Sequence, residues 1–305
     1  MAVSDIAKEF HYHVRSISLP CRIHSSLPKI EKVLKRMKTW EASSQSQSEA
    51  MKEGVKGLVE LYNCVEELVG CPLTHQALLR RHVEKPLDMT VHLLDTCGSA
   101  RELLTLTREH VLDLQSALRR KGVDSSVKNQ ICAYICFRKR ARKDITKRLK
   151  ALKTMENDFK SYSYCLLDFD HRLPMMVDFD HHLLMVVNVL REISKNTITF
   201  FKKLLVFMCA PVLKRNIGGW LVLTRIVSTS FDKENMVMNE MRDIDVALCS
   251  FAKRCKKTDG KTEVEIVKRG LGEVEGSIRE LEAGLDCLFR CMVQQRVSLL
   301  NLLTP

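Results

Sequence analysis

The stretch VKRGLGEVEGSIRELEAGLDCLFRCMVQQRVSLLNL, residues 267 to 302, decides the fold of this chain. Its apolar residues follow one another at alternating spacings of four and three, interrupted once by Gln295: Val267, Leu271, Val274, Ile278, Leu281, Leu285, Leu288, Met292, Leu299 and Leu302. Such a heptad keeps one seam of a helix against neighbouring helices along its whole length. A single helix from Glu263 to Leu302 would be about 60 Å long at 1.5 Å per residue. We call residues 267–302 the heptad tail.

The heptad tail also contains four glycines, Gly270, Gly272, Gly276 and Gly284. Each weakens a helix by up to ~1 kcal/mol relative to alanine. A free-standing coiled coil would tolerate that poorly, whereas a helix enclosed in its own bundle could use glycines for close approach. We therefore expect the heptad tail to be an internal bundle helix that need not dimerise.

The rest of the chain is also predicted to be helical. Twelve glycines and seven prolines in 305 residues are too few to punctuate a many-stranded sheet, and 45% hydrophobic residues is typical of a globular protein. Long apolar-periodic stretches lie between them, with a bend expected at Pro86. The prediction is an all-α, elongated helical bundle. Residues 28–305 would form one domain behind a flexible arm of residues 1–27, with irregular segments near 158–178 and 210–230.

Metal binding is not expected. The segment Asp168 to Val177 is nearly repeated as Asp178 to Val187. Such a duplication doubles the number of aspartates and histidines without any requirement for metal binding. The metal-capable residues of the two copies are Asp170, His171, Asp180, His181 and His182. The cysteines form no Cys-x-x-Cys knuckle, although Cys132/Cys136 and Cys287/Cys291 are spaced to share a helix face.

The twelve cysteines are scattered on helical periods, and the first residues contain no apolar signal-peptide core. We interpret them as reduced, small hydrophobic residues of an intracellular protein, with a cytoplasmic location preferred and a nuclear or membrane-peripheral one left open. The best candidate for a membrane-spanning segment is the apolar run from Leu204 to Leu213. It has half of the roughly twenty residues that a transmembrane helix needs.

Basic residues are concentrated in one segment of a chain whose net charge is +12. Between Arg138 and Lys153 there are nine basic residues and one acidic residue, Asp144. On a helix that turns 100° per residue, the apolar residues fall on one side and six cations fall between about 60° and 200° from Arg138. These six residues, here called the cationic face, are Lys139, Arg140, Lys143, Lys147, Lys150 and Lys153.

The cationic face could bind phosphates, anionic lipid or an acidic protein surface. It could equally be solvated, or paired with the acidic stretch from Glu263 to Asp286 of the same chain. Few aromatic residues interleave the cations, so sequence-specific nucleic-acid binding is not expected. The run Arg138 to Lys143 also resembles a nuclear import signal, a pattern that many cytosolic helices share.

The N-terminal arm carries a second candidate site. Its sequence from Arg15 to Pro20, RSISLP, fits the pattern Arg-Ser-x-Ser-x-Pro that phosphoserine-reading 14-3-3 proteins favour. The arginine would recruit a basophilic kinase, a phosphate on Ser18 would meet an arginine cluster, and Pro20 would turn the chain out of the groove. The alternative is a docking arm whose serines are only polar.

No catalytic motif is present. The sequence contains no phosphate-cradling loop, nucleophile elbow or His-Glu-x-x-His pair, and Gly270-Leu271-Gly272 lies inside the heptad tail with no strand before it. We therefore expect a protein that is not an enzyme and that needs no cofactor.

Several stretches resemble a plant-specific family usually called BYPASS-like. They are the N-terminal segment from His13 to His24, residues 93–102 (LLDTCGSARE), the basic segment that starts at Phe137, and the closing residues 296–303 (RVSLLNLL). The resemblance covers nearly the whole chain. It implies an all-helical, non-enzymatic plant protein linked to root and shoot development, and no functional residue is carried over from it. Two functions remain open: a helical interaction or scaffold protein, and a peripheral protein on an anionic membrane surface.

Overall fold

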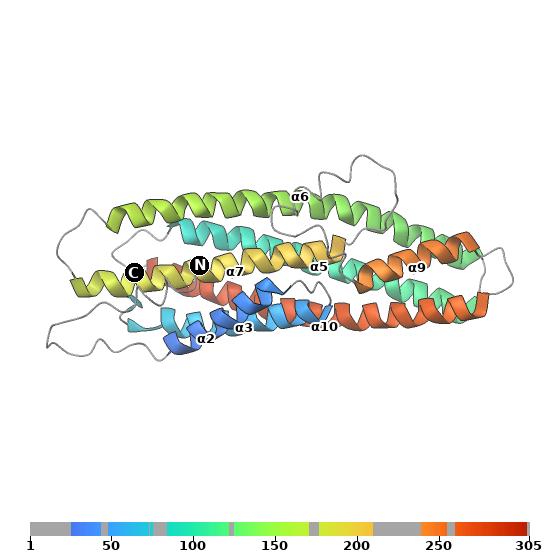
Figure 1. Ribbon diagram of the computed structural model, residues 1–305, viewed down its shortest axis with the longest axis horizontal. Coiled ribbons are helices and arrows are strands. Elements are labelled where there is room, and N and C mark those ends of the chain that lie inside the picture. Colours follow the sequence, from blue (N-terminus) through green and yellow to red (C-terminus); the bar gives the residue numbers. More distant parts are fainter. Residues whose placement is uncertain are drawn as a thin grey trace.

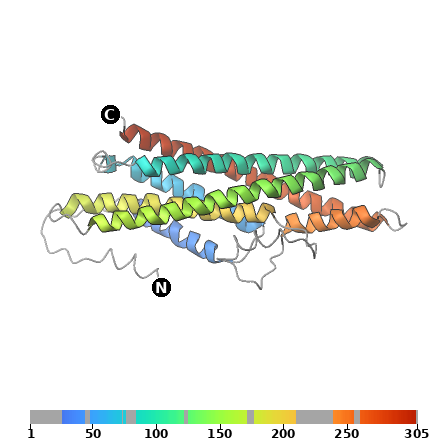
Figure 2. The same cartoon turned by 90° about the horizontal axis from the view of Figure 1, so that it is seen from above.

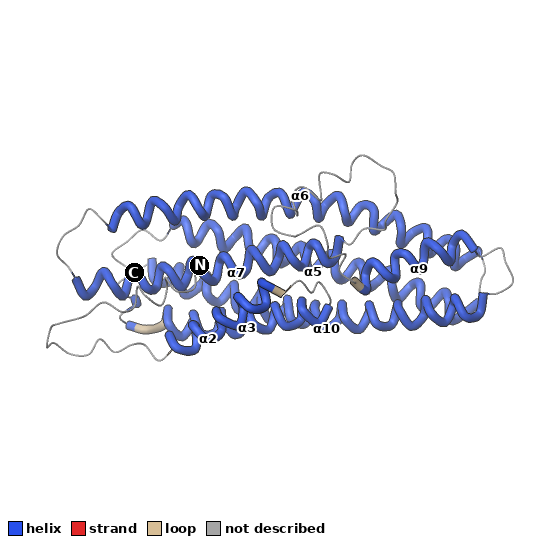
Figure 3. Tube along the Cα trace, in the orientation of Figure 1, coloured by secondary structure: helices blue, strands red, loops and turns tan. Residues whose placement is uncertain are grey.

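The computed structural model describes residues 26–43, 48–72, 74–75, 84–121, 125–170, 177–209, 239–254 and 260–303. These residues form the helices α2 (Leu27–Ala42), α3 (Ser48–Val69), α5 (Glu84–Lys121), α6 (Ser125–Asp170), α7 (Val177–Cys209), α9 (Glu240–Arg254) and α10 (Gly260–Leu303). No strand occurs within them, and Figure 3 shows helices throughout. The all-α prediction is confirmed.

The helices form an elongated bundle. The long helices α5, α6, α7 and α10 run along its long axis, and α9 continues the line of α7 (Figures 1 and 2). Helix α10 packs against α5, α3 and α9, while α6 packs against α5, α7 and α9. The short helix α2 lies on α3 and α7. No helix of the described residues is both long and apolar enough to cross a membrane.

The heptad tail is the spine of this bundle. Its ten apolar seam residues are each at most 5% exposed, and Gln295, which interrupts the heptad, is buried as well. All ten belong to one hydrophobic core that includes residues of the other six helices. The seam therefore faces α5, α3 and α9 of its own chain, as expected for an internal helix.

Close approach explains only part of the glycine content of α10. A Cβ atom at Gly284 would lie 2.6 Å from Val55 Cγ1 of α3, so this position requires glycine. A Cβ at Gly270 would lie 3.3 Å from Ile244 Cδ1 of α9, which is tight. At Gly272 and Gly276 a Cβ would meet nothing within 4 Å, and the expectation of close approach is wrong there.

The junction between α7 and α9 is fixed by Asn239. Its side-chain Oδ1 accepts a hydrogen bond from the Met241 backbone N–H at 2.9 Å, which caps the first turn of α9. Its Nδ2 donates to the Phe207 carbonyl in the last turn of α7 at 3.0 Å. One buried side chain thus joins the end of α7 to the start of α9.

One expected boundary differs from the structure, and another is only partly described. Pro86 lies in the first turn of α5, where its missing N–H would have no intrahelical partner. The bend expected at Pro86 also involves residues 76–83, which lie outside the described residues. Helix α6 continues to Asp170 and α7 begins at Val177, so residues 158–170 and 177–178 of the segment expected to be irregular are helical, and residues 171–176 lie outside the described residues. Residues 158–170 contain no glycine or proline that would end a helix. The segment 210–230 lies outside the described residues, as do residues 1–25 of the arm expected at 1–27. The last residue of that arm, Leu27, is the first residue of α2.

Candidate functional site: the cationic face of α6

Helix α6 is oriented by its apolar stripe. Ile131, Ala141, Ile145, Leu149 and Leu152 are all buried in the core. They follow one another at spacings that keep them on one side of the helix. The opposite side faces outward, because α6 runs along one long edge of the bundle (Figure 1). The stripe thereby determines which charged residues reach solvent.

The cationic face is on that outward side. Lys139, Arg140, Lys143, Lys147 and Lys150 are exposed, and Lys153 is partly exposed. Within the described residues, none of the six side chains makes an ion pair. From Lys139 to Lys153 the face spans about 21 Å of helix at 1.5 Å per residue.

Two arginines of the same helix point inward. Arg138 is 2% exposed and donates from Nε and Nη2 to the Asp245 carboxylate of α9 at 3.2 Å. Arg142 Nη2 reaches the same carboxylate at 2.7 Å, and Tyr134 Oη donates to it at 2.8 Å. Burial, reinforced by the charge of Asp245, raises the pKa of Tyr134, so its hydroxyl stays protonated and donates. This buried cluster fastens α9 to α6.

Arg142 also reaches the end of α7. Its Nε donates to the carbonyl of Cys209, the last residue of that helix, at 3.2 Å. The free carbonyls at a helix C-terminus favour a nearby cation. The basic residues of α6 therefore fall into two groups. Arg138 and Arg142 point inward and join α6 to α7 and α9, whereas the six residues of the cationic face lie on the outward side. Because Arg138 is buried, the run Arg138 to Lys143 is not presented as the continuous basic peptide of an import signal.

The neighbouring histidine adds no charge to this surface at neutral pH. The ring of His110 on α5 lies 4.5 Å from that of Phe137, centroid to centroid. Burial lowers the pKa of His110, and the charge of Arg140 lowers it further, against the opposing effect of Asp113 and Glu109. The imidazole is therefore neutral beside Arg140.

The acidic residues of α10 do not neutralise the cationic face. Glu282 pairs with Arg108 of α5 at 2.9 Å, and Asp286 pairs with Arg101 of the same helix. Glu280 pairs with Lys52 of α3 at 2.8 Å. The sequence left open whether the acidic stretch of α10 pairs with the cationic face of α6. In the structure, Glu280, Glu282 and Asp286 pair with residues of α3 and α5 instead.

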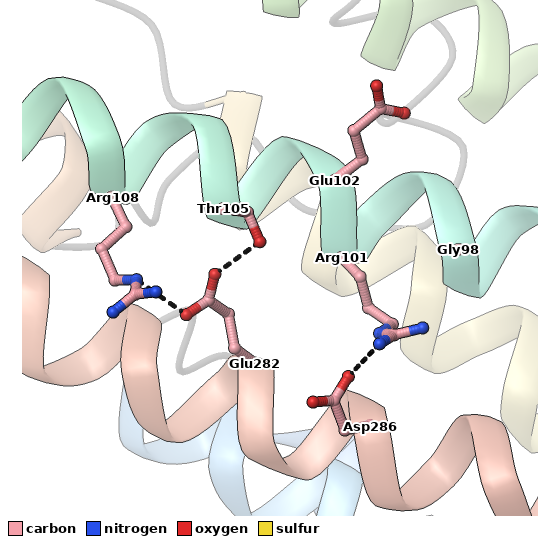
Figure 4. Close-up of a pocket in the computed structure, with 7 residues that line it drawn as sticks. All are labelled: Gly98, Arg101, Glu102, Thr105, Arg108, Glu282 and Asp286. Carbon is pink, nitrogen blue, oxygen red and sulfur yellow. Dashed lines mark hydrogen bonds and ion pairs between the residues drawn. The ribbon is translucent and has the colours of Figure 1, made fainter.

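The two pairs between α10 and α5, Glu282 with Arg108 and Asp286 with Arg101, border a hollow of about 420 Å³ (Figure 4). Its lining residues are Gly98, Arg101, Glu102, Thr105, Arg108, Glu282 and Asp286. Thr105 donates to Glu282 at 2.7 Å, and Glu102 points away from the other side chains in Figure 4. Both arginines already pair with a carboxylate, so neither arginine of this lining is an unpaired cation for an anionic ligand.

The other sequence candidates have different outcomes. Arg15, Ser18 and Pro20 lie outside the described residues. Of the metal-capable residues in the duplicated segment, His182 alone has a described side chain, and its Nε2 lies 3.0 Å from Thr74 Oγ1. The described part of the chain contains no group of three or more metal-capable side chains that could hold an ion.

A family model described as Protein BPS1 matches residues 54–302. The chain belongs to this family. The matched range begins within α3 and extends to the last turn of α10, so it contains the cationic face, the buried cluster around Asp245 and the heptad tail. Comparison with curated proteins gave no match, and comparison with solved structures gave none.

Proposed function

We propose that this member of the Protein BPS1 family is a non-enzymatic helical interaction protein that docks an anionic partner on the cationic face of α6. The observation that supports it is the division of cations on one helix. Arg138 and Arg142 both pair with Asp245, whereas the six residues of the cationic face have no ion pair within the described residues. Uncompensated cations along one rigid edge create a positive potential that attracts anionic surfaces.

The structure favours some anionic partners over others. In the described residues, none of the large hydrophobic side chains that are exposed is aromatic, so the protein offers no stacking platform for unpaired bases. An acidic protein surface and an anionic membrane surface both suit a straight row of lysines. For a scaffold protein the partner would be an acidic protein surface, which we propose first. An anionic membrane surface is the alternative partner.

The family supports the biological setting. Membership suggests a plant developmental protein of unknown molecular activity. The sequence resemblance adds the link to root and shoot development. A docking role agrees with the lack of any catalytic motif in the sequence.

Removing three cations from the centre of the cationic face should weaken anionic binding without unfolding the protein. The test variant combines Lys143→Gln, Lys147→Gln and Lys150→Gln. Each lysine near an anionic surface contributes about 1 kcal/mol, so removing three should weaken binding by about 3 kcal/mol, which is on the order of a 100-fold loss of affinity. Binding to phosphatidylserine vesicles and to immobilised polyglutamate, measured at low and high salt, distinguishes the two partner classes. Because these side chains are solvent-exposed, the thermal midpoint should hardly change.

A matched control exists on α2, where Lys32 and Lys35 are exposed and Lys38 is partly exposed. Replacing these three lysines by Gln makes the same change in net charge at another place. It should alter binding far less. Equal loss in both variants would mean that net charge alone drives binding, and the proposal for α6 would be rejected.

A second partner is proposed for the N-terminal arm. Phosphorylation of Ser18 should create a binding site for a 14-3-3 protein, because the phosphate supplies acceptors for an arginine cluster. The full chain, treated with a basophilic kinase, should be captured by immobilised 14-3-3 protein, and capture should disappear with Ser18→Ala or with phosphatase. Ser16→Ala is the control. Capture that survives Ser18→Ala would show that this serine is not the site.

A further inference from the structure

Two cysteines on α6 are unusually accessible. Cys132 and Cys136 are exposed, whereas the other seven cysteines whose side chains the structure describes are buried or partly buried. Burial raises the pKa of Cys97 to about 12 and also raises the pKa of the Cys64 and Cys209 thiols. Buried thiols of this kind are poor nucleophiles. Among the cysteines whose side chains the structure describes, Cys132 and Cys136 are therefore the most accessible to chemistry at sulfur.

Both thiols lie on the same surface as the cationic face. At 100° per residue, Cys132 falls at about 120° and Cys136 at about 160° from Arg138, inside the sector of about 60° to 200° that holds the cations. The exposed Lys128 falls at about 80°. The carboxylate of Asp144 falls outside the sector, at about 240°. Cys136 is about 4.5 Å along the helix from Lys139, and Cys132 about 10 Å.

The cationic face lacks any apolar anchor of its own. Among the side chains that the structure describes, the exposed large hydrophobic ones lie on α5, α9 and α10, and none lies on residues 126–158 of α6. Unmodified, this surface can hold a membrane only through charge, and salt would screen that attraction. A polybasic patch and an acyl chain together give stable membrane attachment that neither gives alone.

We propose that Cys132 and Cys136 are S-acylated with long-chain fatty acids, and that the anionic surface met by the cationic face is a membrane. This rests on the docking role proposed above for α6 and selects the lipid alternative. Exposed cysteines on an amphipathic helix beside cations are suited to such acylation. Their acyl chains would project from the same side as the lysines, so both signals engage one bilayer.

The chemistry is a thioester exchange. The cysteine loses its proton, and Sγ attacks the carbonyl carbon of a fatty acyl-coenzyme A. A new carbon–sulfur bond forms on the protein, and the bond from the acyl carbon to coenzyme A breaks. Coenzyme A leaves as a thiolate that takes up a proton. No oxidant or reductant is needed.

The test uses the full chain produced in plant cells. Free thiols are blocked with N-ethylmaleimide, thioesters are cleaved with neutral hydroxylamine, and the released thiols are tagged with a maleimide polymer that shifts the band on a gel. The wild type should gain up to two tags that require hydroxylamine. Cys132→Ser with Cys136→Ser should abolish the shift and make the membrane-bound protein extractable by high salt.

A matched control variant combines Cys287→Ser with Cys291→Ser on α10. This pair has the same spacing but is only half-exposed, and Cys291 Sγ donates to Asn63 Oδ1 at 3.4 Å. It should keep both tags. A wild type without hydroxylamine-dependent tags, or tags that persist in the Cys132/Cys136 variant, would overturn the proposal.

Failure of this inference is separable from failure of the docking role. Non-acylated protein made in bacteria should bind phosphatidylserine vesicles at low salt equally well with or without Cys132 and Cys136. Retained vesicle binding without acylation in plants would reject the acylation and leave the docking role in place. Acylation without vesicle binding of the unmodified protein would reject the cationic face as the lipid contact, and with it the two-signal attachment proposed here.

Discussion

Asp245→Ala should lower the free energy of unfolding by about 3–5 kcal/mol, the range for removing one partner of a buried ion pair. Asp245 is 3% exposed, and its carboxylate accepts hydrogen bonds from Tyr134, Arg138 and Arg142. Without it, the guanidinium of Arg138 would be left buried, uncompensated and close to Arg142. Urea denaturation followed by circular dichroism measures the loss. Hydrogen exchange should show the first opening in α9, because the cluster fastens that helix to α6.

Asp243→Ala is the control for that substitution. Asp243 lies on the same helix but is exposed, and its charge near the helix N-terminus should contribute at most about 1 kcal/mol. Replacing Asp245 together with its fully buried partner, Arg138→Met with Asp245→Leu, should cost less than Asp245→Ala, because the guanidinium of Arg138 is then not left in the core without a carboxylate. Arg142 also loses Asp245, but its side chain is 23% exposed and keeps its hydrogen bond to the Cys209 carbonyl. If Asp245→Ala costs no more than Asp243→Ala, the buried cluster does not stabilise the fold.

The sequence contains a pattern that indicates this buried cluster: Arg138 and Asp245 each occupy a position in the apolar stripe of their own helix. Arg138 falls on the apolar side of α6, in line with Ile131, Ile145 and Leu149. Asp245 likewise follows Met241 by four residues and precedes Leu248 by three, so it interrupts a buried stripe. Two opposite charges, each within an apolar stripe, suggest that they meet. The sequence could not show which helices become neighbours, and the pair is separated by 107 positions.

Predictions that depend on one helix alone agree best with the structure. The seam of α10 and the separation of α6 into an apolar side and a cationic side follow from 3.6-residue periodicity, which needs no knowledge of the partner. The role of each glycine depends on the neighbour, so Gly284 and Gly276 look alike in sequence although only Gly284 faces Val55. The ion-pair partners of Glu280, Glu282 and Asp286 depend on the bundle topology in the same way.

Helix ends were predicted less well for a related reason. The serines and tyrosines of residues 161–164 weaken a helix only slightly, so α6 continues through them to Asp170. The bend expected at Pro86 rests only on a proline inside an apolar-periodic region. A proline is equally compatible with a first turn, and periodicity alone does not separate the two.

Truncation after Lys261 should abolish cooperative folding of the whole chain. It removes the heptad tail, whose seam is covered by α5, α3 and α9, and it would expose the apolar faces of all three helices. Urea denaturation of the truncated chain should show no sigmoidal transition, and a dye that binds exposed apolar surface should fluoresce in its presence. The effect exceeds that of any point substitution because α10 contacts more of the core than a single side chain can.

A graded version separates the internal helix from an intermolecular coiled coil. Leu285→Ala in the full chain should cost about 2–5 kcal/mol, because Leu285 is fully buried against its own chain. Val297→Ala on the exposed side of the same helix should cost less than about 1 kcal/mol. For an internal helix, the loss at Leu285 is independent of protein concentration, since no second chain takes part. A truncated chain that still unfolds cooperatively, with only self-association lost, would mean that the seam joins two molecules.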